Sequence, residues 1–223
     1  MQDPKLLLLL DIVIEHYISK WDPIGSKFLH SLEDVEYAPS TLRKYLNVLE
    51  KSGLVYQPYN SSGRIPTVKG LSMYIEQQIH EDVKDIEAEE MDIKNARMDL
   101  KRLVEALGSV ADGVVAGFLK NDEYFFLWIN NLLKEDVHED YKSVREIIKF
   151  IESKKIISLL DEKLMKRNQI YYSFFEGDDV VISCLYTKIN IAGYDCVMTV
   201  LGPTRVNYRK NVAILQRVLQ TLA

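Results

Sequence analysis

The sequence predicts a mixed α+β protein made of two unlike parts joined by a long helix. In the first 75 residues, apolar spacing and turn residues give the order helix, helix, helix, hairpin, helix. In the last third, an amphipathic helix precedes two strands joined by a polar turn, and a further helix closes the chain. With 223 residues, 47% of them hydrophobic, the chain suffices for one large domain or two small ones.

The first part is expected to begin with three helices. Residues 5–19 are apolar at helical spacing, and a turn rich in Pro and Gly precedes a short helix at 26–32. Pro39 suits the first turn of a third helix, because its missing N–H costs nothing there. That helix runs to about Lys51, and Gly53 ends it.

A hairpin and a fourth helix complete this part. Residues 54–57 have β character, 60–63 form a turn, and 64–65 begin the return strand. Thr67 is placed to cap a helix that begins at Val68. This order of elements is typical of a winged helix-turn-helix.

The helical pattern continues from 73 to 107. Its apolar residues alternate spacings of three and four, as in a coiled-coil seam, at Ile93, Ala96, Leu100, Leu103 and Leu107. Two interpretations stay open: a solvated connecting helix that packs on a neighbour, or a helix that forms a dimer.

The last third is expected to form an α+β domain. Residues 141–164 read as an amphipathic helix, 180–186 and 194–201 as strands, and 207–222 as the closing helix. The Gly202-Pro203 pair is expected to break the second strand.

Composition and motifs exclude several classes of function. A net charge of −5 argues against a uniformly basic nucleic-acid coat, and two cysteines favour a reducing, cytoplasmic compartment. The longest apolar run, which Asp11 interrupts, falls short of the roughly 20 residues that span a membrane. Neither phosphate-binding glycine motif occurs, and the four histidines are far apart. We therefore expect no catalytic residue, metal or cofactor.

Positive charge gathers on the third helix, the hairpin and the start of the fourth helix. Residues 40–70 carry five basic residues against one acid, Glu50. Leu42, Leu46 and Leu49 share the face that must pack inward, and polar and basic residues take the other. The predicted DNA-binding residues are Ser40, Thr41, Arg43, Lys44, Asn47, Lys51, Ser61, Ser62, Gly63, Arg64 and Lys69. The alternative for the helix alone is a solvated basic face.

These residue types suit different parts of DNA. Arg43 can read guanine and Asn47 adenine, while the lysines suit phosphates. The small residues of the hairpin allow close approach to the backbone, and Arg64, expected at the tip of the loop, suits the minor groove.

Several runs of this chain resemble one family of regulators. The residues concerned are PIGSK at 23–27, TLR at 41–43, LEKSGL at 49–54 and, above all, QPYNSSGRIPTVKG at 57–70. Near the C-terminus, VLGPTRVNY at 200–208 is a second such run, and NNLL at 130–133 is a weaker third. Together they resemble the heat-inducible transcription repressor family HrcA.

The resemblance implies a winged helix followed by a GAF-like domain with an inserted dimerisation segment. It implies binding to double-stranded operator DNA at an inverted repeat, the CIRCE element, before chaperone operons. A palindromic site needs two recognition helices related by a twofold axis, so a homodimer is expected. The resemblance also implies that the GroEL chaperonin keeps the repressor active and that heat stress releases it.

The chain departs from the family pattern in two places. The stretch 107–130 is too short for the inserted segment and the first half of a GAF-like domain, so a reduced domain is expected. Lys44-Tyr45 stands where the family typically has Asn-Asp, which predicts an altered operator preference. The expected parts are a winged helix at 1–75, a connecting or dimerising helix at 76–110 and the reduced GAF-like domain at 111–223.

Two rival functions keep part of this architecture. One is a winged-helix regulator with a small-molecule sensor and a different operator, in which a cavity would be lined by Cys184, Tyr186, Tyr194 and Cys196. An ordinary filled sheet face is the simpler reading of those four residues. The other rival is a protein-interaction module that has lost DNA binding, against which the basic helix and the hairpin argue.

Overall fold

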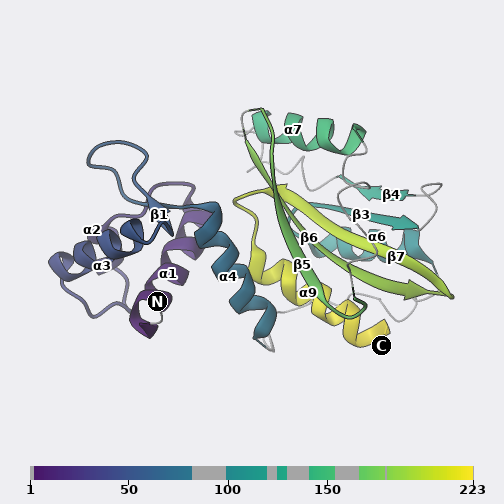
Figure 1. The fold of residues 1–223 in the computed structure, drawn as a ribbon, viewed down its shortest axis with the longest axis horizontal. Coiled ribbons are helices and arrows are strands. Elements are labelled where there is room, and N and C mark those ends of the chain that lie inside the picture. The colour runs from purple at the N-terminus through teal and green to yellow at the C-terminus, as the bar shows by residue number, and fades with distance from the viewer. Residues whose placement is uncertain are drawn as a thin grey trace. The chain divides into compact units, whose positions relative to one another are not determined.

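The computed structural model of the chain describes residues 3–81, 99–119, 125–129, 141–153, 166–178 and 180–222. The chain divides into two compact units, Met1–His80 and Glu81–Ala223, and each is described by itself (Figure 1).

The first unit contains the predicted helices. Asp3 caps the first helix by accepting a hydrogen bond from the Lys5 N–H at 3.0 Å. The core between the helices is apolar and closed to solvent, with Leu10, Leu29 and Leu42 fully buried. The helices are α1 (Pro4–Lys20), α2 (Ser26–His30), α3 (Pro39–Lys51) and α4 (Val68–His80), which confirms their predicted positions.

A short antiparallel hairpin lies between α3 and α4. Its strands are β1 (Val55–Tyr56) and β2 (Ile65–Pro66), as the sequence predicted. Beside β2, Ile24 and Arg64 form an antiparallel bridge through hydrogen bonds of 2.9 and 2.8 Å. The turn before α2 is thereby tied to the base of the hairpin.

Thr67 caps α4, as predicted. Its hydroxyl accepts from the Gly70 N–H at 3.1 Å and donates to the Gly53 carbonyl at 2.7 Å. A Cβ on Gly70 would lie 2.1 Å from the Leu54 carbonyl oxygen, so only glycine lets α4 pack this close to the start of β1.

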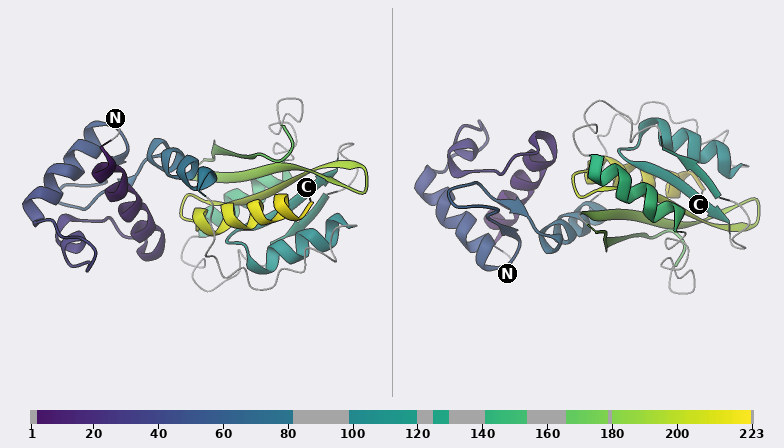
Figure 2. Two further views of the ribbon diagram at one scale, coloured as in Figure 1. Left: turned by 90° about the horizontal axis from the view of Figure 1, so that it is seen from below. Right: turned by 90° about the horizontal axis from the view of Figure 1, so that it is seen from above.

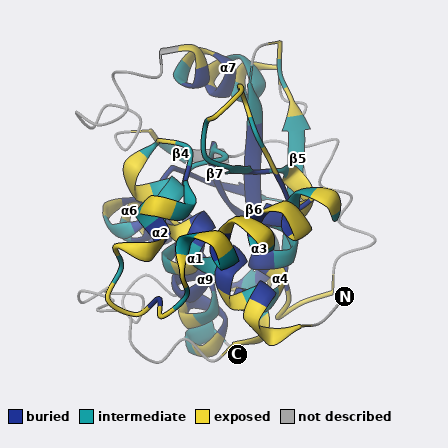
Figure 3. Ribbon diagram, turned by 90° about the vertical axis from the view of Figure 1, so that its left-hand side faces the viewer, coloured by how far each residue is buried: buried dark blue, intermediate teal, exposed yellow. Residues whose placement is uncertain are grey.

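The second unit is built on a five-stranded antiparallel sheet in the order β4-β3-β7-β6-β5. Much of β6 and β7 is buried (Figure 3). The strands are β3 (Val114–Leu119), β4 (Phe125–Trp128), β5 (Ile170–Glu176), β6 (Val181–Ile191) and β7 (Tyr194–Pro203). The mixed α+β architecture is consistent with a GAF-like domain.

The sheet is larger than the two strands predicted, and one detail of the prediction is wrong. The stretch 107–130, for which no strand was predicted, supplies β3 and β4 of the sheet. The strand predicted to break at Gly202 continues to Pro203, because both residues pair with β6. The helix predicted at 141–164 is described only in part, as α7 (Tyr141–Glu152), since 154–165 lie outside the described residues.

Helices cover both faces of this sheet (Figure 2). On one face, Ile147 of α7 packs into an apolar cluster with Cys184 and Leu201. On the other lie α6 (Leu100–Val110) and α9 (Tyr208–Leu222), the helix predicted to close the chain. A Cβ on Gly117 would lie 2.9 Å from Leu100, so the glycine lets α6 approach β3 closely.

The single helix expected over 73–107 is wrong. The fourth helix ends at His80, and Asp99 has extended backbone and caps α6 by accepting from the Lys101 N–H at 2.9 Å. Residues 82–98, which include Ile93 and Ala96 of the predicted seam, lie outside the described residues. The other members, Leu100, Leu103 and Leu107, are buried in the second unit, with α6 packed on the sheet of its own chain.

Hydrogen bonds join the turn after β7 and the start of α9 to Asp112, which precedes β3. Asp112 accepts from the Asn207 N–H at 2.6 Å, and the Asp112 carbonyl accepts from the Asn211 amide at 2.7 Å. The Tyr208 hydroxyl donates to the Thr204 carbonyl at 3.1 Å. The GPTR-containing run singled out in the sequence therefore fixes the start of α9.

Three charged residues form a cluster of ion pairs at one end of the sheet. Asp195 on β7 pairs with Arg167 and with Lys188, whose Nζ lies 3.3 Å from the carboxylate. Burial alone would raise the pKa of Asp195, but hydrogen bonds from Asn190, Arg167 and Lys188 outweigh it and hold the pKa below its usual value of 3.8.

Candidate nucleic-acid interface

Helix α3 presents two sharply different faces. Leu42, Leu46 and Leu49 are buried in the first unit, as the spacing predicted. On the outer side Thr41 is half-buried, and the exposed residues of the predicted set are Ser40, Arg43, Lys44, Asn47 and Lys51. The helix therefore packs through its leucines and offers its polar side to solvent.

The cations of this outer side are available to a ligand. Within the described part of the chain, Arg43, Lys44 and Lys51 have no hydrogen-bond or ion-pair partner. Unpaired cations along one side of a helix match the phosphates that flank a DNA groove wide enough to admit a helix.

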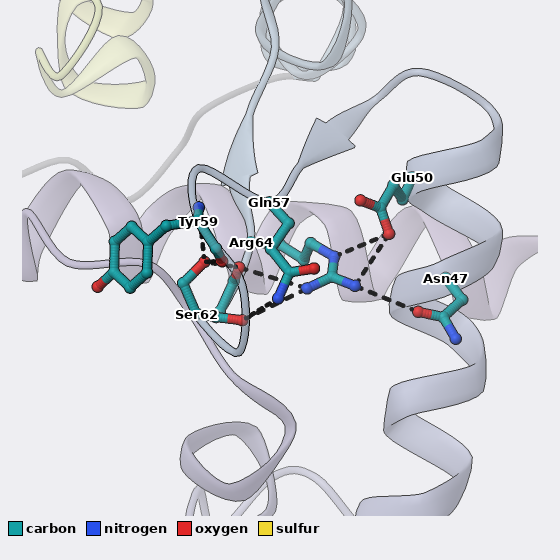
Figure 4. Close-up of polar contacts among 7 residues, drawn as sticks. Asn47, Glu50, Gln57, Tyr59, Ser62 and Arg64 are labelled. Atoms are coloured by element: carbon teal, nitrogen blue, oxygen red, sulfur yellow. Dashed lines mark hydrogen bonds and ion pairs between the residues drawn. The ribbon is translucent and has the colours of Figure 1, made fainter.

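The hairpin tip is a tight turn. The Ser62 hydroxyl donates to the Tyr59 carbonyl at 2.7 Å, and the Ser62 N–H reaches the same oxygen at 3.1 Å (Figure 4). Ser61 has a φ of 65°, the left-handed conformation that such a turn requires. The Gln57 amide donates to the Ser62 carbonyl at 3.0 Å and braces the loop from within.

Two residues of this loop were not predicted from the sequence. Tyr59 is 65% exposed at the turn, and Gln57 holds the loop closed. Both flank Pro58 in the run that carries the family resemblance, and that position was the available signal.

Arg64 lies at the base of the hairpin, so the expectation that it sits at the tip is wrong. Its guanidinium donates to Glu50 Oε2 from Nε at 3.1 Å, and Nη2 lies 2.9 Å from the same oxygen. Nη2 also reaches Asn47 Oδ1 at 3.3 Å (Figure 4). The side chain of Arg64 is only 13% exposed, because α3 and the loop enclose it.

Gly63 has a steric reason for its identity. A Cβ at this position would lie 2.4 Å from the Ile24 carbonyl carbon and 2.5 Å from the Pro23 carbonyl. The hairpin can therefore pack on the turn before α2 only if residue 63 lacks a side chain. This contact joins two runs of the sequence that carried the family resemblance.

Lys69 supports the fold as well as the basic surface. Its ammonium donates to the Ser52 carbonyl at 2.9 Å, beyond the last turn of α3. A cation at this end of a helix interacts favourably with the helix dipole. The lysine remains exposed, so it also adds positive charge to the side of the unit that carries α3.

The four residues expected to line a sensor cavity do not converge. The strand register puts Cys184 and Tyr186 on the face of the sheet that α7 covers, and Tyr194 and Cys196 on the opposite face. Tyr194 is 69% exposed, whereas burial raises the pKa of the Cys184 thiol well above its usual range. These four side chains therefore cannot share one pocket.

The described residues lack two other kinds of site. No group of three or more histidine, cysteine, aspartate or glutamate side chains is arranged to hold a metal ion there. Over the same residues, none of the helices has the length and apolar character needed to cross a membrane.

Comparison with known proteins gives a consistent result. The family model for the C-terminal domain of the HrcA protein matches residues 66–212. A heat-inducible transcription repressor HrcA from Ruminiclostridium cellulolyticum is 29% identical over 170 residues, which cover 75% of this chain and 46% of that protein. The repressor of the same name from Trichormus variabilis is 37% identical over 89 residues, or 40% of this chain and 24% of that protein. The chain thus spans less than half the length of these curated relatives.

One solved structure shares the fold. The crystal structure of a hypothetical protein determined at 2.2 Å resolution has a TM-score of 0.67 to this chain at 15% sequence identity. The match covers 100% of this chain and 96% of that one.

Proposed function

Because the chain belongs to the HrcA family, we propose that it is a DNA-binding transcription repressor that acts on heat-shock chaperone operons. The observation that carries the proposal is the outer side of α3. Its arginine, lysine and asparagine side chains are exposed, and the three cations lack partners within the described residues. A helix that enters a DNA groove needs exposed donors and cations on one side, and α3 offers both there.

The first unit then functions as a winged helix, with α3 as the recognition helix and the hairpin as the wing. Arg43 and Asn47 contact base edges, while Lys44 and Lys51 contact phosphates. Ser40, Thr41 and Lys69 add polar contacts at the two ends of this surface. The wing, through Ser61, Ser62 and Gly63, brings its backbone close to the DNA, which small side chains permit.

The proposed operator is an inverted repeat of the CIRCE type. A repeat of this symmetry is bound by two copies of the chain related by a twofold axis, so the active form is a homodimer. We further propose that the GroEL chaperonin supports the active form and that heat stress releases the DNA, by family resemblance.

Transcription in vitro tests this proposal. Purified polymerase would transcribe one template with a CIRCE element at the promoter and another with that element scrambled. The chain is expected to reduce transcripts from the first template alone and to lose this effect on heating. Equal repression of both templates would contradict the proposal.

Matched variants locate the effect. Arg43→Ala is expected to weaken repression, because it removes a base contact worth roughly 1–3 kcal/mol. Arg102→Ala is the control, since Arg102 is an exposed arginine of the second unit whose 4.0 Å ion pair to Asp99 lies at the surface. Equal behaviour of the two variants would exclude α3 as the reading helix.

A further inference from the structure

The guanidinium of Arg64 is already committed within the chain. Its Nε and Nη2 face Glu50, and its Nη1 lies 3.4 Å from each of the carbonyl oxygens of Ser62 and Gly63. An arginine has five N–H donors and no acceptor. Because all three of its nitrogens face acceptors of the protein, little donor capacity remains for a phosphate or a base.

Asn47 is the one exposed partner in this network. Its amide shares Nη2 of Arg64 with Glu50, at an Oδ1 distance of 3.3 Å. Since the guanidinium can only donate, the asparagine must turn its carbonyl oxygen toward Arg64 and its NH₂ group away. The network thus fixes which end of the Asn47 amide is free.

That orientation bears on which base the helix reads. A bidentate contact to adenine uses both the oxygen and the nitrogen of an asparagine amide. An amide whose oxygen is held by Arg64 instead offers hydrogen-bond donors, which suit guanine N7 and O6 or thymine O4.

We propose that Arg64 is a positioning residue that presents Asn47 as a hydrogen-bond donor, so that α3 reads an acceptor edge at this position of the operator. The inference rests on the proposed function, because it concerns how the same surface recognises DNA. It replaces the expected insertion of Arg64 into the minor groove.

Glu50 supports this assignment. A carboxylate among the bases of residues 40–70 repels DNA phosphates and weakens binding in general. Its contacts to Nε and Nη2 hold the guanidinium plane against α3, where it reaches Asn47. The acid therefore contributes to selectivity at the expense of non-specific affinity.

Binding titrations separate a positioning role from a phosphate contact. We would titrate Arg64→Gln, Asn47→Ala and their double variant into a CIRCE duplex and a scrambled duplex at several salt concentrations. Each single variant is expected to lower the preference for the CIRCE duplex on the order of tenfold. The double variant should lose no more of this preference than either single variant does, since both substitutions disrupt the same Arg64–Asn47 interaction.

The salt dependence of binding shows whether Arg64 contacts a phosphate, because loss of a phosphate contact changes that dependence. Arg64→Gln should leave the slope of log K against log salt unchanged, whereas Lys44→Gln should reduce its magnitude by about 0.9. A reduction of that size for Arg64→Gln, or losses that multiply in the double variant, would overturn the proposal.

A second variant guards against a folding defect in Arg64→Gln. Glu50→Gln keeps Arg64 and Asn47 but removes the charge that holds the guanidinium. The preference for the CIRCE duplex should therefore fall, while affinity for scrambled DNA holds or rises. An unchanged preference would count against the network.

A measurement without DNA distinguishes this inference from the proposed function. The NH₂ signals of Asn47 in NMR spectra should report an ordered amide in the wild-type chain and a mobile one in Arg64→Gln. If the wild-type chain does not discriminate between the duplexes, the proposed function fails, and the NMR result alone decides the positioning role. Equal mobility in both proteins would overturn that role whatever the DNA result.

Discussion

Gly63→Ala is the substitution for which the structure makes the sharpest stability prediction. The new Cβ would lie 2.4 Å from the Ile24 carbonyl carbon and 2.5 Å from both the carbon and the oxygen of the Pro23 carbonyl. Ordinary carbon contacts need about 3.5 Å, so the hairpin base has to retreat by about 1 Å. All of the obstructing atoms are backbone, which leaves no flexible side chain to yield.

The cost follows from the hydrogen bonds that this retreat breaks. Ile24 and Arg64 exchange two backbone hydrogen bonds, of 2.9 and 2.8 Å, at this point. Each is worth roughly 0.5–1.5 kcal/mol, so the first unit should lose about 2 kcal/mol of stability. In a unit of this size such a loss lowers Tm by roughly 8–16 °C.

Thermal unfolding by circular dichroism and amide hydrogen exchange at Ile24 and Arg64 measure this effect globally and locally. Gly25→Ala is the matched control, since Gly25 has ordinary extended backbone and its Cβ would meet only the Gly63 Cα, at 4.0 Å. If Gly63→Ala retains the Tm and the amide protection of Gly25→Ala, the steric reasoning is refuted.

Three further predictions concern other parts of the chain. Thr67→Ala should cost about 1 kcal/mol of the unfolding free energy by removing the cap of α4, and Thr67→Ser should restore most of it; equal urea midpoints for the two variants would contradict the capping role. Leu103→Ala should cost about 2–5 kcal/mol, because Leu103 is fully buried in the second unit; a loss below 1 kcal/mol in urea unfolding would mean that α6 is not part of that core. The ionised form of Asp195 stabilises the fold above its ordinary pKa of 3.8, and this contribution is lost as pH falls through the lower pKa of the folded state. The Tm difference between wild type and Asp195→Asn should therefore shrink as pH falls below 3.8, and a difference that stays constant with pH would exclude this linkage.

The first unit was readily predicted from its sequence because local signals there agree. Pro39 and Gly53 bracket α3, and the leucine spacing identified its buried face. Thr67 preceded an apolar helical run and does cap α4. In each case the residues that determine the element lie within a few positions of one another. Hydrophobic periodicity and turn residues report on structure over that same short range.

The second unit was harder because its strands and its helix give ambiguous signals. Residues 114–119 are apolar without alternation, since both faces of β3 are covered, so they lacked the pattern of a half-exposed strand. Leu100, Leu103 and Leu107 have the spacing of a dimer seam, and the same spacing serves a helix that packs on a sheet. Only the tertiary structure distinguishes these two uses.

The network at the base of the hairpin was not predictable in detail. Glu50 and Arg64 are 14 residues apart, and nothing local indicates that they pair. The sequence showed only that Glu50 was the single acid in a basic stretch. An isolated acid of this kind is a useful sign of a structural partner among the surrounding bases.

We propose that this chain prefers one DNA sequence, and an equilibrium titration measures that preference. Purified chain would be titrated by fluorescence anisotropy into a CIRCE duplex and a scrambled duplex of equal length at two salt concentrations. We expect a preference for the inverted repeat of about a thousandfold or more, kept at the higher salt. Equal affinity for both duplexes, abolished by salt, would indicate backbone contact alone and would contradict it.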